Sequence, residues 1–68
     1  MTPAEWVVRA RIRRAQLLLE TTQLDMERVA AQCGFGSASV LRQHFAATVG
    51  TSPLAYRRAF SRDQRLPS

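Results

Sequence analysis

The sequence predicts an all-α domain of about four helices, and three observations lead to this fold class. Apolar residues recur at the three- and four-residue spacing of a helix face, as in Val8, Ile12, Ala15 and Leu19. Residues that favour helix starts, and glycines that favour helix ends, divide the chain into successive helical segments. No segment shows the polar–apolar alternation typical of a strand. The 68 residues are enough for one small domain.

The first helix is expected over residues 1–22. Thr2 is a suitable N-cap, Pro3 fits the first helical position, and Glu5 can bond back to the cap. Trp6 lies beside the apolar stripe, so we expect it to anchor the core.

A second and a third helix are expected on either side of a glycine turn. Asp25 is placed to cap the second helix, and Gly34 is placed to end it in a left-handed conformation. Phe35 would then fill the space between the helices, and Ser37 would cap a third helix over residues 37–49. Two short helices joined in this way form a helix-turn-helix, which we expect to be homeodomain-like.

A fourth helix shows the same start signals as the first. Ser52 is the expected N-cap, Pro53 the first helical residue, and Tyr56 a core anchor. The helix-turn-helix unit with this following helix covers residues 23–60. The polar residues 61–68 are expected to form a flexible tail.

The third helix carries the side chains from which we predict DNA binding. On a helical wheel, Ser39, Arg42 and Gln43 lie opposite the apolar side. In a major groove Arg can bind guanine through two atoms, Gln can bind adenine likewise, and Ser suits either base. Each good pair contributes about 1–3 kcal/mol of discrimination. Ala38 is a further candidate base contact, to a thymine methyl group, with filling of the capping turn as the alternative.

Candidate contacts to DNA phosphates are Ser37, Arg57, Arg58 and Arg14. Ser37 is expected to act first as an N-cap, with the phosphate contact as a second role. For Arg57 the alternative is an intramolecular pair with an acidic residue. For Arg14 the alternative is solvation or pairing with a glutamate of the first helix.

The charge of the chain also favours an anionic partner. All ten basic residues are arginine, against five acidic residues, which gives a formal net charge of +5. Nucleic acid is the first expectation for such a small basic domain. The alternative is a basic helical module that binds an acidic protein surface or RNA polymerase, with only weak, non-specific DNA binding.

Several functional classes are disfavoured. No nucleophile–base pair or pair of carboxylates is placed for catalysis, so we expect neither an enzyme nor a cofactor. Cys33 is the only cysteine, which excludes an internal disulfide and a cysteine-based metal site. We expect Cys33 to be buried and His44 to flank the core. No apolar run is long enough to span a membrane, and the expected location is the cytoplasm.

Residues 29–60 resemble the second helix-turn-helix of the AraC/XylS family of bacterial transcription regulators, and the first helix is similar to that family's linker helix. The matching positions are Ala30, Gly34, Phe35, Ser37, Phe45, Gly50, Ser52, Pro53, Tyr56 and Arg57, with Pro3, Trp6, Arg11, Ala15, Leu18 and Leu19 upstream. The resemblance implies double-stranded DNA as partner, the third helix in the major groove, and a dimeric parent with a sensing N-terminal domain. The residue pattern GFGSA…LRQHF…GTSP…YRRAF also resembles the branch of the family whose N-terminal domain is amidase-like (DJ-1/PfpI-like).

A repeat suggests that the chain is a fragment of a larger protein. Thr2, Pro3 and Trp6 match Ser52, Pro53 and Tyr56 at a constant offset of 50 residues. The helix start that closes one helix-turn-helix unit therefore also opens the chain, as if another unit preceded it. The first helix would then expose apolar surface through which the fragment could self-associate; the candidates are Ala4, Val7 and Val8.

Overall fold

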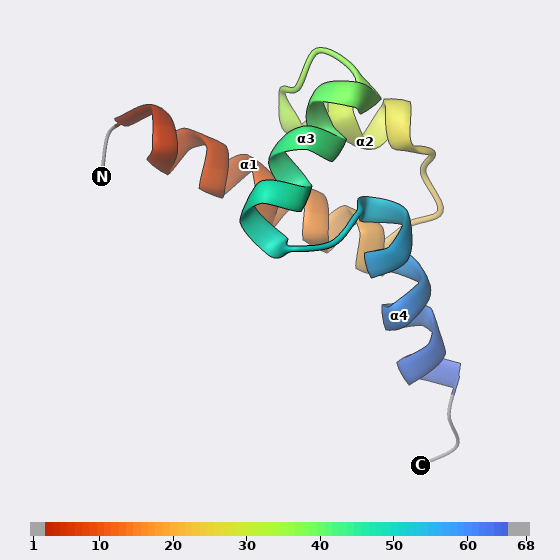
Figure 1. Cartoon of the computed structure of the whole chain (residues 1–68). Helices are drawn as coiled ribbons and strands as arrows, with labels where there is room; N and C mark the ends of the chain where they lie inside the picture. The colour runs from red at the N-terminus through yellow and green to blue at the C-terminus, as the bar shows by residue number, and fades with distance from the viewer. Residues whose placement is uncertain (1–2, 66–68) are drawn as a thin grey trace.

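The computed structural model describes the backbone of residues 3–65 and the side chains of residues 3–60. This part of the chain forms four helices and no strand, which confirms the predicted fold class. The helices are α1 (Pro3–Thr21), α2 (Met26–Cys33), α3 (Ala38–Val49) and α4 (Pro53–Arg65). α1 contacts all three other helices, and in Figure 1 its first turns project away from them.

The core forms around the predicted stripe of α1. Ile12, Ala15 and Leu19 are buried, and Val8 packs at the edge of the cluster. Their period brings them to one side of the helix, where α2 and α3 lie against them. The other buried members are Val29, Ala30, Cys33, Phe35, Leu41 and Phe45. Burial raises the pKa of the Cys33 thiol, against the opposing charge of Arg14, so the group is a neutral core residue.

The prediction that Trp6 anchors the core is wrong. Its side chain is 65% exposed, and Val7 beside it is also exposed. The reason is its place on the helical wheel: at 100° per residue Trp6 lies nearly opposite the stripe that contains Val8 and Ile12, so it faces away from the core. The ribbon in Figure 1 shows the other helices gathered along the later part of α1. Tyr56 does reach the core, as predicted: its ring meets the edge of Phe45 at a centroid distance of 5.5 Å.

Two predictions concern the start of α1 and the end of α4. The expected Thr2 cap lies outside the described residues. α4 continues to Arg65, so residue 60 is not a helix end, and the first part of the predicted tail 61–68 is helical. The flexibility of that tail stays a prediction.

α4 is clamped to the C-terminal end of α1. The Tyr56 hydroxyl donates a hydrogen bond to the Glu20 carboxylate. Arg57 donates from Nε to the Leu19 carbonyl at 3.3 Å, and from Nη2 to the Thr22 carbonyl at 3.2 Å. The last carbonyls of a helix lack partners and carry partial negative charge. Since α1 has no basic residue in its own last turn, α4 provides the cation from outside.

We expect alkaline pH to weaken this clamp. The hydrogen bond to Glu20, with burial and the carboxylate charge, raises the pKa of Tyr56 above its ordinary 10.0. The folded state therefore holds the proton more tightly than the unfolded chain. The resulting stabilisation is complete below about pH 10 and is lost as the pH rises through the folded-state pKa.

The measurement is the free energy of unfolding of the wild type and of Tyr56→Phe at several pH values. The wild type should lose stability more steeply above about pH 10 than the variant, which has no phenol to titrate. Tyr56 is the only tyrosine, so phenolate absorbance reports its pKa directly. Equal slopes for the two proteins would show that the contact does not couple folding to this proton.

Candidate nucleic-acid interface

The turn between α2 and α3 is built around Gly34. As predicted, this glycine has a left-handed conformation, with φ of 85° and ψ of 12°. The Gly34 N–H donates to the Ala31 carbonyl at 3.3 Å, and the Phe35 N–H donates to the Ala30 carbonyl at 2.9 Å. These bonds satisfy carbonyls at the end of α2 and let the chain reverse at once.

Phe35 joins the turn to the core and to α3. It is buried in the same cluster as Leu41 and Phe45. Its ring also stacks on His44 of α3, with centroids 5.4 Å apart and an interplanar angle of 17°. His44 is half-buried, so it flanks the core as expected. The turn is therefore packed directly against the following helix.

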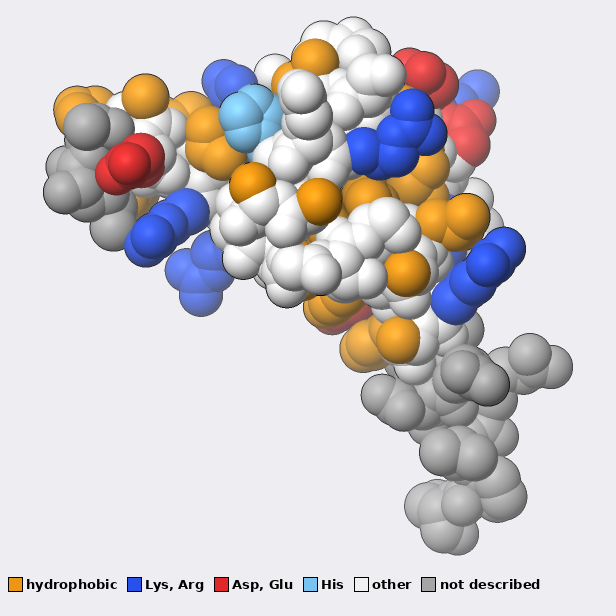
Figure 2. Space-filling view, viewed as in Figure 1, with side chains coloured by type: hydrophobic (Ala, Val, Ile, Leu, Met, Phe, Trp, Pro, Cys, Tyr) orange, Lys and Arg blue, Asp and Glu red, His pale blue; other side chains and the backbone are white. Residues whose placement is uncertain are grey.

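α3 buries one side and exposes the other. Leu41 and Phe45 have no exposed surface, while Ser39, Arg42 and Gln43 are all exposed. The prediction that these three polar residues face outward together is confirmed, and their contacts with bases stay a prediction. Figure 2 shows that the surface over α3 is largely uncharged, with basic side chains at several points around it.

A contact between Ala38 and a base would need an exposed side chain, but Ala38 is buried. Its side chain is only 6% exposed, because the start of α3 packs against the core. Its N–H donates to Oε2 of Glu27, on α2, at 3.4 Å. With so little exposed surface, the Ala38 methyl group is the weakest of the four candidate base contacts.

The phosphate candidates are separated by the structure. Ser37 caps α3, as predicted, with its Oγ accepting the Val40 N–H at 3.3 Å. Arg14 and Arg58 are exposed. Arg57 is half-buried and donates to the end of α1, so it has partners within the chain. These partners are two backbone carbonyls and not the acidic residue of the predicted alternative.

Sequence reasoning missed a role for Arg11. Its Nη1 donates to the Gly34 carbonyl at 3.2 Å, across 23 residues of chain. The available signals were its match to the linker helix and its place on α1 next to Ile12, and neither identifies a partner.

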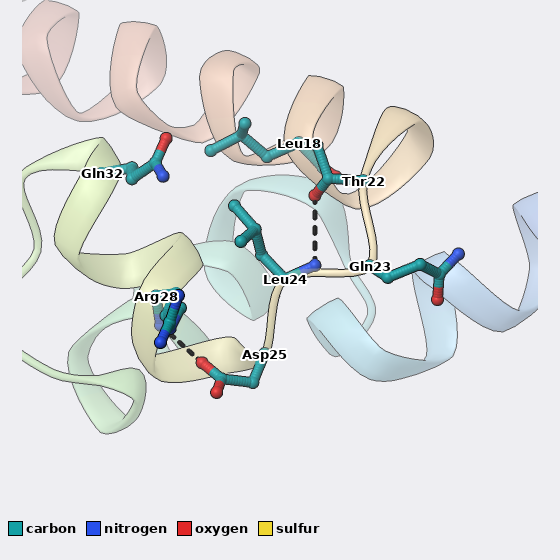
Figure 3. A pocket seen from close by; sticks show the side chains of 7 residues that line it. All are labelled: Leu18, Thr22, Gln23, Leu24, Asp25, Arg28 and Gln32. Atoms are coloured by element: carbon teal, nitrogen blue, oxygen red, sulfur yellow. Dashed lines mark hydrogen bonds between the residues drawn. The ribbon is translucent and has the colours of Figure 1, made fainter.

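An open hollow lies apart from the α3 surface (Figure 3). Its residues come from the end of α1, the connecting loop and α2: Leu18, Thr22, Gln23, Leu24, Asp25, Arg28 and Gln32. Two polar groups there already serve the backbone. The Thr22 hydroxyl accepts the Leu24 N–H at 3.3 Å, and Asp25 caps α2 by accepting the Arg28 N–H at 2.8 Å. No α3 side chain lines this hollow.

Within residues 3–65, no helix has the length and apolar character needed to cross a membrane. Among the side chains of residues 3–60, no group of three or more His, Cys, Asp or Glu is arranged to bind a metal ion.

The geometry of α2, the left-handed turn and the outward-facing α3 defines a helix-turn-helix module. A family model described as "Helix-turn-helix domain" matches residues 1–59. The chain belongs to this family, the helix-turn-helix domains of AraC type, as the resemblance implied.

Similar proteins agree with this assignment. The chain is 42% identical over 59 residues to the HTH-type transcriptional regulator Rv1931c of Mycobacterium tuberculosis, covering 87% of this chain and 23% of that protein. It is 37% identical over 57 residues to "Probable transcriptional regulator LumQ" of Photobacterium leiognathi, covering 84% and 23%. The chain thus spans about a quarter of the length of these curated relatives.

A solved structure resembles the whole fold. It is the crystal structure of the DNA-binding domain of AdpA, a global transcriptional factor, in complex with a target DNA. The TM-score is 0.87 at 43% identity, and the match covers 96% of this chain and 58% of that one.

The geometry of the turn can be tested with three alanine substitutions. Gly34 and Gly50 both have left-handed φ values, 85° and 90°, which cost an alanine about 1–2 kcal/mol. A Cβ at Gly34 would also lie 3.1 Å from Nε of Arg11, whereas one at Gly50 meets nothing within 4 Å. Gly36 has neither constraint and is the matched control.

We expect Gly34→Ala to lower the free energy of unfolding most, Gly50→Ala less, and Gly36→Ala by under about 0.5 kcal/mol. Urea denaturation followed by circular dichroism gives the three values. A loss at Gly36 as large as that at Gly34 would contradict the described turn.

Proposed function

We propose that this chain is a sequence-specific DNA-binding module of a bacterial transcription regulator, with α3 entering the major groove. The observation that carries the proposal is the division of α3 into a buried and an exposed side. Leu41 and Phe45 of α3 are buried in the core. As a result, Ser39, Arg42 and Gln43 lie on the exposed side of the helix. An α-helix fits the width of a major groove.

The exposed side chains have the chemistry for base recognition. Arg42 and Gln43 lie three and four residues after Ser39, so each is a neighbour of Ser39 on the helix surface. Arg42 can donate to O6 and N7 of guanine, and Gln43 can pair with N6 and N7 of adenine. Ser39, one turn earlier, can donate or accept at either kind of base.

Phosphate contacts would supply most of the affinity. The net charge of +5 supports such contacts, and Arg58 and Arg14 are the exposed candidates that remain. Ser37, at the N-terminus of α3, is a further candidate because helix N-termini attract anions. A chain with few phosphate contacts binds non-specific DNA at about 10⁻⁴–10⁻⁶ M, so its specific affinity will also be modest.

The relatives support the same function. Two curated relatives are named as transcriptional regulators, and the resembling AdpA domain was crystallised with its target DNA. For the longer protein in which such a domain acts, our proposals are a cytoplasmic location and contact with RNA polymerase. For the chain as a fragment, we propose self-association through the exposed start of α1. An amidase-like N-terminal domain also stays a prediction about that protein.

Replacing Arg42 by alanine should relax sequence preference. The probes are a duplex enriched by this chain from a random library and a scrambled duplex of equal composition. We expect Arg42→Ala to lose about 1–3 kcal/mol of the preference between them. Arg9→Ala is the charge-matched control, because Arg9 is exposed on the projecting part of α1. Anisotropy titrations at several salt concentrations measure both binding constants.

The two substitutions should differ in a defined way. Arg9→Ala should leave the preference between the duplexes unchanged. For every protein the logarithm of the binding constant should fall with the logarithm of salt concentration. If no duplex binds in a salt-dependent manner at about 10⁻⁴ M, DNA is not the partner and binding to an acidic protein is favoured.

A further inference from the structure

The turn that leads into α3 is held by Arg11 at its start. Nη1 of Arg11, on α1, donates to the Gly34 carbonyl at 3.2 Å. The guanidinium also covers the open face of the glycine, since a Cβ there would lie 3.1 Å from Nε and 3.2 Å from Cζ. Gly34 is therefore suited to its place in two ways: it adopts the left-handed conformation, and it leaves room for this cation.

The end of the same turn is held by Glu27. Its Oε2 accepts the N–H of Ala38, the first residue of α3, at 3.4 Å. A negative charge is favourable at a helix N-terminus, and α3 has no acidic residue in its own first turn. Ser37 satisfies another free N–H of the first turn, that of Val40. α2 thus provides the anion that α3 lacks.

These two contacts share features that set them apart from core packing. Both charged residues are exposed, and each binds backbone rather than an opposite charge. Exposed contacts of this kind contribute little to global stability. They do, however, fix both ends of the short segment that sets the tilt of α3, and base recognition tolerates errors of only about 0.5 Å.

We propose that Arg11 and Glu27 are positioning residues for DNA recognition, acting through the turn rather than on DNA itself. The proposal rests on the function proposed above. Base contacts by Arg42 and Gln43 require a defined approach angle, whereas phosphate attraction does not. Loss of either contact therefore lowers the ratio of specific to non-specific binding, with little effect on folding.

Glu27 allows a sharp test because charge and position act in opposite directions. Removing its negative charge favours attraction to phosphates, so non-specific binding should stay equal or increase. If Glu27 positions α3, the preference for the enriched duplex should nevertheless fall in Glu27→Ala. We expect a fall of about 3- to 10-fold in the ratio of the two binding constants, which corresponds to the loss of one hydrogen bond. Glu27→Gln loses the same charge but keeps an acceptor, so it should recover part of the preference.

Arg11 is tested with the charge held constant. Arg11→Lys keeps the cation but loses the fork that reaches the Gly34 carbonyl. A positioning role predicts a similar drop in preference with the salt dependence unchanged. A direct phosphate contact predicts no drop, because lysine can replace arginine as a point charge at a phosphate.

The experiment uses the enriched and scrambled duplexes with wild type, Glu27→Ala, Glu27→Gln and Arg11→Lys, each first checked for folding by circular dichroism. A wild type with no preference between the duplexes overturns both the proposed function and this inference. A wild type with a preference that all three variants keep overturns the inference alone. A general loss of binding to both duplexes at an unchanged ratio also overturns it, since that outcome indicates damage to the fold.

Discussion

The burial of Leu41 and Phe45 against the stripe on α1 fixes the rotation of α3 about its axis. A helix has a single period, so once these two residues are inside, Ser39, Arg42 and Gln43 must be outside. No separate interaction is needed to direct the polar residues outward. The hydrophobic core of this small domain and its recognition surface are therefore two consequences of the same packing.

Some of the arginines bind the protein's own backbone, while others are exposed to solvent. Arg11 and Arg57 bind backbone carbonyls, at the end of α2 and the end of α1 respectively. Both helices end without a basic residue of their own in the last turn, so distant cations provide the compensation. The net charge of +5 consequently overstates the number of arginines that are free to meet phosphates.

Local patterns predicted the helices and the ends of the turn well, because capping residues and left-handed glycines act within a few residues. Asp25, Ser37 and Gly34 all have the expected roles. Trp6 was assigned wrongly from the same local pattern, because it lies nearly opposite the apolar stripe on the helical wheel and is exposed. The other differences from the sequence-based predictions depend on distant neighbours. Ala38 is buried because the start of α3 packs against the core. Arg57 has hydrogen-bond partners 35 and 38 residues away along the chain.

The position of Trp6 has a practical consequence for spectroscopy. It is the only tryptophan in the chain, and its side chain is exposed to water on the side of α1 that faces away from the core. Its emission will respond weakly when the helices melt, and a soluble quencher will reach it in the native state. Contact at the start of α1 would instead shield the indole and shift the emission to shorter wavelength. The chain thus carries a built-in optical reporter of encounters at that end.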